Sequence, residues 1–295
     1  MIADNMSETE LGALLLPNET IDRSGIYIAK GIAERTVWDK HAIENPTHAV
    51  ISAKDEESAK KKSEVQIADI KRYLKTTDIL LDFGSGYGRV AKYILPGMPL
   101  RGYVALDSSY EMLALFKERY IRSDVEQQTP LLLVNADIHT VPLRTASVDV
   151  VLVAAVFLHN HKDVVNKAME EIRRVLKPGG LILVYSSFPR LATVMGLQGS
   201  AYQMLLNLLG KPFKNGPVRY YSKTEVTKLF ARFSEVDIVP VGFEIIPKTL
   251  IFLPGPIEKI YRVGFSKPLN RFLEHLVPAS MKHHFAMHFD VIAKR

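Results

Sequence analysis

The chain has 295 residues, which is enough for one large domain with a sizeable core, or for one domain with insertions. Its 38 basic and 32 acidic residues give a net charge of +6, which is mild for this length, and the only dense basic run is Lys60–Lys62, so we expect no nucleic-acid partner. The absence of cysteine excludes disulfides, thiolate nucleophiles and thiolate metal sites.

The sequence shows no sign of targeting to or across a membrane. Its first residues, MIADNMSETE, are acidic and polar, unlike a secretory signal. No run of about 18 consecutive apolar residues is present, so we expect no transmembrane helix. We therefore predict a cytoplasmic protein and leave a peripheral membrane contact open.

The first part of the chain, residues 1–62, is predicted to be a partly helical N-terminal extension. Residues 1–30 show no clear periodicity, and we expect them to form a mobile or loosely docked arm. The only tryptophan, Trp38, follows close to Asp39 and His41. We interpret Trp38 as a packing anchor for an N-terminal helix, because tryptophan is usually buried, with a flap over a cofactor as the alternative.

Hydrophobic periodicity predicts alternating helices and strands over most of the remaining chain. Strands are expected at 78–83, 103–107, 131–135, 148–154, 181–186, 235–241 and 283–293. Helices are expected at 58–74, 89–95, 109–120, 164–176 and 223–233. This alternation indicates an α/β fold, with a doubly wound parallel sheet and helices on both of its faces.

The stretch Ile79–Arg89, ILLDFGSGYGR, is the feature around which the other elements are arranged. An apolar strand runs into Gly84, Gly86 and Gly88, which allow a sharp turn and let a ligand approach the backbone. The dinucleotide fingerprint G-x-G-x-x-G would require a third glycine where Arg89 stands, so an NAD-dependent oxidoreductase is disfavoured. Asp107 does not discriminate, because it lies near the acidic position of that fingerprint. No Walker loop is present, since no Gly-Lys-Ser/Thr follows.

Polar residues gather at the predicted carboxyl ends of the strands. Asp82, Asp107, Asp137 and His159 each lie at or just past such an end. Ligands of open parallel sheets bind outside the carboxyl ends of the strands. These four side chains therefore mark one site, independently of any family.

Two segments exceed a minimal domain of this type, at about 188–220 and 243–281. The first contains the apolar run Tyr202–Leu209, and the second begins with the apolar run Phe243–Pro254. We expect these insertions to pack together as a substrate cover within a domain that spans 63–295.

The apolar surfaces of the insertions have two interpretations. They either bury each other, or they form an apolar acceptor pocket or a face for a membrane or a partner chain. We predict a mainly hydrophobic acceptor cavity, walled by the insertions and opening toward His159.

Five motifs occur in a characteristic order: LDFGSGYGR, ALDSS at 105–109, NADI at 135–138, VDVVLVAAVFLH at 148–159 and KPGG at 177–180. In this order they resemble the class I S-adenosylmethionine-dependent methyltransferases, most closely the small-molecule group. The resemblance covers about 65–189 well and 220–233 loosely. It implies a Rossmann-like, mostly parallel seven-stranded sheet with an antiparallel last strand. It also implies S-adenosylmethionine as cofactor and S-adenosylhomocysteine as product.

The resemblance assigns the cofactor site residue by residue. Gly84 and Gly86 would pass close to the methionine and ribose portions, and Asp82 would lie below the methionine amino group. Asp107 would accept hydrogen bonds from both ribose hydroxyls, with a helix cap as its purely structural alternative. The adenine would meet Asp137 through its amino group and Ile138 through its ring. The remaining assigned positions are Ser85, Ser108, Met112 and Ala154.

Two histidines are the catalytic candidates. His159 and His161 follow the fourth strand, where an imidazole could accept a proton from a nucleophile. The alternative for His159 is a residue that only lines the pocket, since alignment alone supplies much of the catalysis of methyl transfer. No metal site is expected: the adjacent His283 and His284 are predicted to lie on a strand, where they would point to opposite faces.

The sequence thus predicts a methyltransferase that acts on O, N or C of a small, apolar or aromatic acceptor. The alternatives are a non-catalytic S-adenosylmethionine-binding partner subunit and, with less support, an RNA methyltransferase. The identity of the acceptor and the oligomeric state are not predicted.

Overall fold

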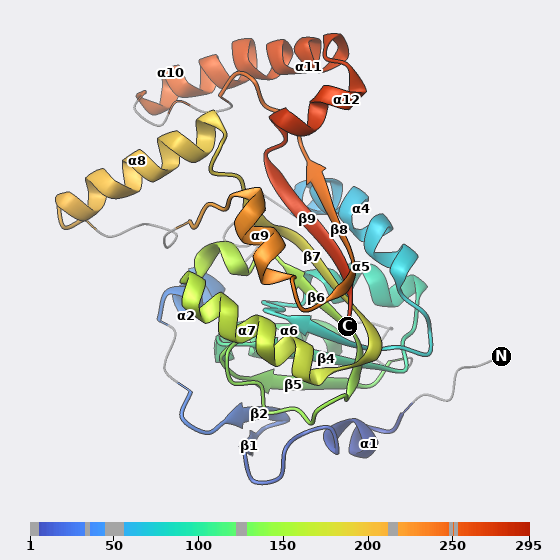
Figure 1. Ribbon diagram of the computed structural model, residues 1–295. Helices are drawn as coiled ribbons and strands as arrows, with labels where there is room; N and C mark the ends of the chain where they lie inside the picture. Colours follow the sequence, from blue (N-terminus) through green and yellow to red (C-terminus); the bar gives the residue numbers. More distant parts are fainter. Residues whose placement is uncertain are drawn as a thin grey trace.

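A computed structural model describes residues 6–32, 36–44, 56–121, 129–211, 218–247, 250 and 253–295. Within these residues one sheet has nine strands, in the order β1-β2-β5-β4-β3-β6-β7-β9-β8 (Figure 1). In chain order the strands are β1 (Thr20–Arg23), β2 (Ile26–Ala29), β3 (Ile79–Phe83), β4 (Gly102–Asp107), β5 (Leu131–Asn135), β6 (Val148–Ala154), β7 (Leu176–Pro189), β8 (Ser234–Val241) and β9 (His288–Lys294).

The strand directions confirm the predicted fold class. All neighbours from β2 to β7 pair in parallel, and β9 lies antiparallel between β7 and β8. The last strand is therefore antiparallel, as predicted. The predicted number of seven strands is wrong, because an N-terminal hairpin adds two strands at the other edge.

That hairpin also contradicts the expected loosely docked arm over 1–30. β1 pairs antiparallel with β2, and Ile26–Ile28 of β2 pairs in parallel with β5. Just before the hairpin, Leu11 is completely buried in the core beneath the sheet. A Cβ on Gly102 of β4 would lie 2.7 Å from Leu11 Cδ1, which shows how closely the two segments pack. Four-residue strands are too short to show a periodic pattern, so hydrophobic periodicity does not reveal them.

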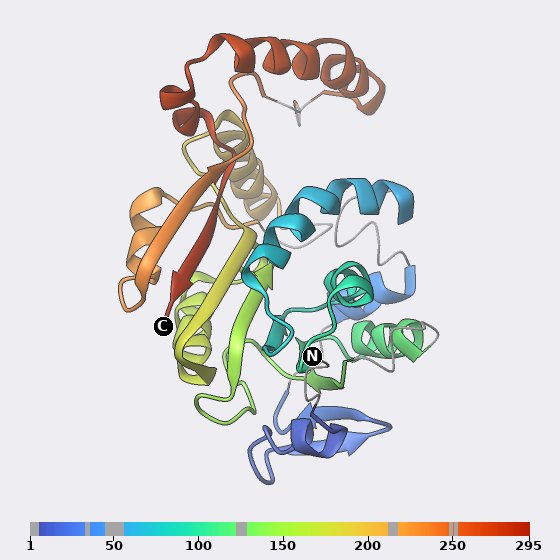
Figure 2. The same cartoon turned by 90° about the vertical axis from the view of Figure 1, so that its right-hand side faces the viewer.

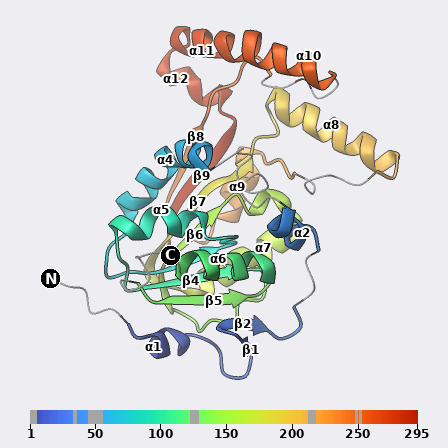
Figure 3. The same cartoon turned by 180° about the vertical axis from the view of Figure 1, so that it is seen from behind.

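Helices cover both faces of the sheet. α7 (Lys162–Val175) and α9 (Lys223–Leu229) lie on one face (Figure 1), and α4 (Glu56–Tyr73), α5 (Arg89–Ile94) and α6 (Tyr110–Ile121) lie on the other (Figure 3). The remaining helices and helical turns are α1 (Glu8–Gly12), α2 (Thr36–Glu44), η1 (Leu95–Gly97), η2 (Phe157–His159), α8 (Val194–Leu208), α10 (Gly255–Ile260), η3 (Tyr261–Ser266), α11 (Lys267–Leu276), α12 (Ala279–Lys282) and η4 (His283–Phe285).

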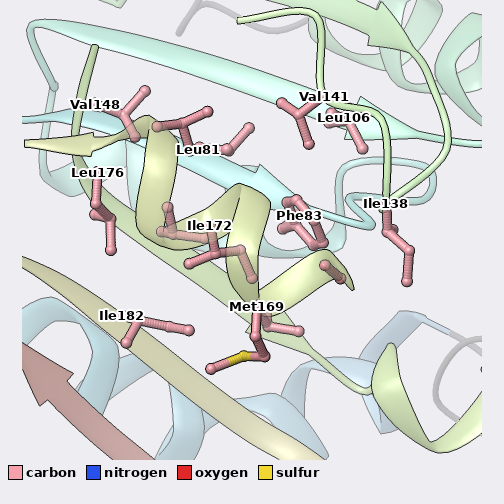
Figure 4. Close-up of a cluster of buried hydrophobic side chains, with 14 of the residues drawn as sticks. Leu81, Phe83, Leu106, Ile138, Val141, Val148, Met169, Ile172, Leu176 and Ile182 are labelled. Atoms are coloured by element: carbon pink, nitrogen blue, oxygen red, sulfur yellow. The ribbon is translucent and has the colours of Figure 1, made fainter. Parts of the chain in front are cut away.

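A separate apolar cluster fills the space on each face. Met169 and Ile172 of α7 pack against Leu81 and Phe83 of β3 on one face (Figure 4). On the other face, Leu80 packs with residues of α4, α5 and α6. Because β3 is buried on both faces, its residues have to tolerate burial, and this explains the apolar run Ile79–Leu81.

Two strands begin at residues other than those predicted from the sequence. β7 starts at Leu176 and includes the KPGG turn, where Gly179 has a φ of 78° and the register with β6 shifts. β9 starts only at His288, because His283 and His284 form the helical turn η4. Their ring centroids lie 3.9 Å apart, so the expectation that they point to opposite faces is wrong.

The insertions are mostly helical. α8 follows β7, and α10, η3, α11 and α12 connect β8 to β9. Figures 1 and 2 show these helices standing beyond one end of the sheet. No helix in the described part of the chain is long and apolar enough to cross a membrane. The division into an N-terminal extension and a domain with a substrate cover stays a prediction.

The burial of Leu11 allows a test of whether the N-terminal segment belongs to the folded core. Leu11→Ala should lower the free energy of unfolding by about 2–5 kcal/mol, because the side chain leaves a cavity beneath the sheet. Ile21→Ala is the matched control: Ile21 is 63% exposed and should change stability by less than about 0.5 kcal/mol. Urea denaturation measures both, and equal small losses would mean that the segment contributes nothing to the core.

Candidate functional site

The turn after β3 is shaped by glycines that cannot be replaced without moving their neighbours. Gly84 and Gly88 have φ angles of 82° and 80°, which favour glycine. A Cβ on Gly84 would lie 2.4 Å from Val156 Cγ2, and one on Gly88 would lie 2.5 Å from Phe116 Cδ2. The amides of Gly84 and Ser85 both donate to the carbonyl of Leu106, at 2.7 and 3.0 Å. The turn is therefore fastened to the end of β4.

A cavity of about 190 Å³ opens beside this turn. Residues from the carboxyl ends of β3, β4, β5 and β6 line it, as the positions of the polar residues predicted. The lining residues are Trp38, Gly84, Gly86, Asp107, Ser108, Met112, Asp137, Ile138, Ala154, Ala155, Val156, His159 and Asn160. The cavity thus brings together nine of the twelve residues that the sequence assigned to the site.

Asp107 is held by backbone amides on both of its carboxylate oxygens. Gly86 N–H donates to Oδ2 and Ser109 N–H donates to Oδ1, each at 2.8 Å. Burial raises the pKa of Asp107 to about 6, against the lowering effect of these amides. Ser109, whose hydroxyl accepts from Met112 N–H, caps the following helix. Asp107 therefore both braces the turn and presents its carboxylate to the cavity.

Asp82 supports the site from below and does not line it. Its side chain is 1% exposed and accepts a hydrogen bond of 2.5 Å from Tyr103 Oη–H. Burial raises the pKa of Asp82 to about 6, and the nearby guanidinium of Arg89 opposes the shift. Arg89 is itself buried and donates to Ser63 Oγ at 3.0 Å and to Gln66 Oε1 at 3.2 Å.

Trp38 closes the cavity opposite the glycine turn. Its ring lies edge-on to the ring of His159, with centroids 5.2 Å apart, and also contacts His41 at 5.7 Å. It packs as well against the small buried cluster of Ala42, Tyr87 and Met112. Our packing interpretation of Trp38 is therefore incomplete, because the same side chain forms a wall of the cavity.

Two further assigned residues lie outside the cavity lining. His161 is exposed, with Nε2 3.1 Å from Arg219 Nη2. Ser85 is buried within the glycine turn, and among the described residues its hydroxyl has no hydrogen-bond partner. Such a buried polar atom normally finds a partner, so it is consistent with a polar ligand group at the turn.

Apart from Trp38, three lining residues had not been assigned from the sequence. Ala155 and Val156 follow β6 without any polar group to draw attention to them, although Ala155 has an unusual φ of 60°. Asn160 donates from Nδ2 to the carbonyl of Val156 at 3.0 Å and thereby braces this loop. The one signal in the sequence that could have identified Asn160 is its position as a polar residue between the two candidate histidines.

The predicted walls of the acceptor cavity are not observed here. No described residue of either insertion, 188–220 or 243–281, lines the cavity that contains His159. The insertion helices follow the ends of β7 and β8, on the side of the sheet away from β3 and β4. Their sequence distance from the glycine turn gave no indication of this displacement.

The lining suits S-adenosylmethionine. Gly84 and Gly86 line the cavity with backbone that carries no Cβ, so a ligand can approach it closely. The two oxygens of Asp107 each bind one amide and retain acceptor capacity for a vicinal diol. Apolar Met112 and Ile138 offer surfaces for an aromatic base.

Comparisons with known proteins agree with this site. Residues 81–184 match the model of a methyltransferase domain family. A demethylmenaquinone methyltransferase from Chlamydia caviae is 32% identical over 111 residues, which are 38% of this chain and 45% of that protein. The match therefore spans less than half the length of this relative.

Solved structures share the fold at low sequence identity. One is the methyltransferase of a complex with the Haloferax volcanii Trm112 methyltransferase activator, with a TM-score of 0.56, 17% identity, and coverage of 89% of this chain and 99% of that chain. Another is an S-adenosylmethionine-dependent methyltransferase from Archaeoglobus fulgidus, with a TM-score of 0.51, 14% identity, and coverage of 81% and 96%. The family model shows that residues 81–184 form a methyltransferase domain, and the solved structures show that the chain shares the fold of S-adenosylmethionine-dependent methyltransferases.

Proposed function

We propose that the chain transfers a methyl group from S-adenosylmethionine to O, N or C of a small, mainly hydrophobic acceptor. The observation that carries this proposal is the cavity at the carboxyl ends of β3 to β6, where the glycine turn, Asp107, Asp137 and His159 meet. S-adenosylmethionine supplies an activated methyl group on a sulfonium, whose leaving group is neutral. Alignment of the acceptor therefore carries much of the rate.

The orientation that we propose for the cofactor is the one that the resemblance to the methyltransferases implies. Gly84 and Gly86 would face the methionine and ribose portions, and Asp107 would accept from the ribose diol. Asp137 would accept from the adenine amino group, with Ile138 against the ring. Trp38 and His159 line the same cavity, with their rings edge-on to each other. We place the acceptor beside His159, whose imidazole orients the acceptor or takes its proton.

Replacement of Asp107 tests the cofactor placement. Asp107→Ala removes the diol acceptor and releases two backbone amides, so the affinity for S-adenosylhomocysteine should fall by about 1–3 kcal/mol. Calorimetry with S-adenosylhomocysteine measures this loss. Asp163→Ala, at an exposed position on α7, is the control and should bind as the wild type does. Unchanged affinity in Asp107→Ala would mean that the ligand lies elsewhere.

His159 provides a second test. If its imidazole accepts the proton, His159→Ala should lower turnover about 10²–10⁴-fold, while calorimetry shows near-wild-type affinity for S-adenosylhomocysteine. His275→Ala, at an exposed site on α11, serves as the control. A loss below about tenfold would leave His159 only as a lining residue, next to Trp38.

Apolar surface on the insertions supports a hydrophobic acceptor. Most of the exposed large apolar side chains among the described residues lie on α8 or between Leu253 and Met281. Leu208, Ile260 and Phe272 are each at least 60% exposed. Large exposed apolar patches usually mark binding surfaces. The relative from Chlamydia caviae is named for demethylmenaquinone, a hydrophobic quinone, and this agrees with an acceptor of that class.

The same helices fit a peripheral contact with a membrane that holds such an acceptor. Lys259, Lys267 and Arg271 are exposed beside the apolar side chains of α10, η3 and α11. Basic residues next to an apolar face are typical of helices that lie in the interface of an anionic bilayer. We therefore propose that these helices, together with the uncharged α8, lie on an anionic lipid surface.

Vesicle co-sedimentation tests the membrane contact. The wild type should sediment with phosphatidylcholine vesicles that contain phosphatidylglycerol, and less so at high salt. The double substitution Ile260→Glu and Phe272→Glu should reduce partition at least about tenfold, since each buried side chain contributes about 1.5–3 kcal/mol. Ile21→Glu, on the exposed strand β1, should have no effect.

Either of two results would contradict the membrane contact. The first is equal sedimentation of the wild type and the double variant. The second is a wild-type dimer in gel filtration that the double variant converts to a monomer, because the apolar face would then meet a second copy of the chain.

An assay for S-adenosylhomocysteine release with phenols, hydroquinones, amines and RNA separates the candidate functions. Turnover with an apolar phenol or hydroquinone supports the proposal. Binding of S-adenosylhomocysteine without turnover favours the non-catalytic partner subunit, and turnover with RNA alone favours an RNA methyltransferase. A cytoplasmic location stays a prediction.

A further inference from the structure

A second cavity borders the cofactor site. It is a groove of about 760 Å³ between α4 and the strands β7, β9 and β8. Figure 2 shows α4 (light blue) next to β7 (yellow), with β9 and β8 (red and orange) beyond β7. Ala155 lines both this groove and the cofactor cavity, so the two meet at the loop after β6. Nothing in the proposed cofactor placement uses the groove.

The loop between the two cavities has a strained backbone. Ala155, directly after β6, and Ser186, within the neighbouring strand β7, have φ angles of 60° and 52°. Residues other than glycine rarely adopt such angles, and they concentrate at functional sites. Ala155 N–H donates to the carbonyl of Tyr185 at 2.9 Å, which joins the end of β6 to β7. The backbone that separates the two cavities is therefore held in a defined, strained conformation.

Asp290 lies on the groove side of this wall. It is 8% exposed, and its Oδ1 accepts from Ser186 N–H at 2.8 Å and lies 3.5 Å from His288 Nε2. Both of these contacts use Oδ1, so Oδ2 remains available to a group in the groove. Burial raises the pKa of Asp290 to about 6, with Asp69 across the groove adding to the shift.

The groove combines this carboxylate with apolar walls. Val65 on α4 and Val241 on β8 form opposite sides, and Ile292 lies near Asp290 on β9. The other titratable groups that line the groove are Asp69, Arg72, Tyr73 and Arg89 from the helix side and Tyr185 and His288 from the strand side. Tyr185 Oη–H donates to Asp69 Oδ2 at 2.7 Å, which engages that second carboxylate.

We infer that the groove is the acceptor site of the proposed methyltransferase, and that Asp290 binds the acceptor's nucleophilic hydroxyl and takes its proton. This inference rests on the proposed function, and it chooses between the two roles given to His159: with Asp290 as the base, His159 orients the acceptor and takes no proton. An apolar body would lie between Val65 and Val241, with its hydroxyl on Asp290 and its oxygen directed at Ala155. A phenol or hydroquinone has this combination of an apolar ring and an acidic hydroxyl.

The transfer step balances with these groups alone. An oxygen lone pair of the acceptor forms the new bond to the methyl carbon. The carbon–sulfur bond breaks, and its electron pair stays on sulfur, which gives neutral S-adenosylhomocysteine. The hydroxyl proton passes to the Asp290 carboxylate, which releases it to solvent after the product leaves.

A variant that blocks the groove tests whether the acceptor binds there. The probe is 2-naphthol, which is titrated into protein saturated with S-adenosylhomocysteine, and its fluorescence reports binding. Val65 is 82% exposed on the rim, so Val65→Trp should fold normally and reduce 2-naphthol affinity at least about tenfold. S-adenosylhomocysteine affinity should not change. Ile21→Trp, remote on β1, should bind both ligands as the wild type does.

Failure of the groove assignment differs from failure of the proposed function. Wild-type protein that does not bind S-adenosylhomocysteine would overturn the proposed function. Normal S-adenosylhomocysteine binding together with no 2-naphthol binding, or with equal 2-naphthol binding in Val65→Trp and wild type, would overturn the groove assignment alone.

The pH dependence of binding tests Asp290 itself. As pH rises through about 6, wild-type Asp290 becomes a carboxylate, and the affinity for 2-naphthol should rise about tenfold, as expected for a hydrogen bond to a charged group. Asp290→Asn should abolish this rise while S-adenosylhomocysteine affinity stays constant. If Asp290→Asn keeps the same pH dependence, another group such as His288 or Asp69 is responsible, and the role given to Asp290 is wrong.

Discussion

The close passage of the glycine turn over the end of β4 is the constraint on which the site depends. Gly84 and Ser85 donate to the carbonyl of Leu106, and Gly86 donates to Asp107 in the same strand. Side chains at positions 84 and 88 would collide with Val156 and Phe116, so the same turn also packs closely against the loop after β6 and against α6. The turn, the carboxylate and the cavity are thus set by one piece of local geometry.

The second constraint is electrostatic. Asp82, Asp107 and Asp290 are all withdrawn from water, and burial raises the pKa of each to about 6. Their unfolded pKa values are lower, so each lends stability that is fully present below the unfolded value and is lost as pH rises through about 6. The fold therefore carries three buried carboxylates that are unfavourable near neutral pH. Asp107 lines the cofactor cavity and Asp290 lines the groove, so ligand groups that donate to these two carboxylates would offset part of that cost, whereas Asp82 lines neither.

The sequence predicts these features unequally, for physical reasons. Strands buried on both faces must be continuously apolar, and parallel strands must end at one edge, so Asp107 and Asp137 could be placed together without a structure. The N-terminal hairpin has no such pattern, because its strands are four residues long. The groove is even harder to predict from the sequence. Val65 of α4 and Asp290 of β9 both line it, and only the antiparallel insertion of β9 between β7 and β8 brings these two residues together.

The insertions show why apolar content alone does not locate a pocket. Tyr202–Leu209 and Phe243–Pro254 are apolar enough to wall a cavity, yet the described residues of these segments line neither the cofactor cavity nor the groove. Several of their side chains, including Leu208, are exposed to solvent instead. An apolar segment satisfies its hydrophobicity equally well by lining a cavity, by packing on another helix or by meeting a lipid surface. Only topology decides among these, and here the helices follow β7 and β8, beyond the end of the sheet and displaced from the glycine turn.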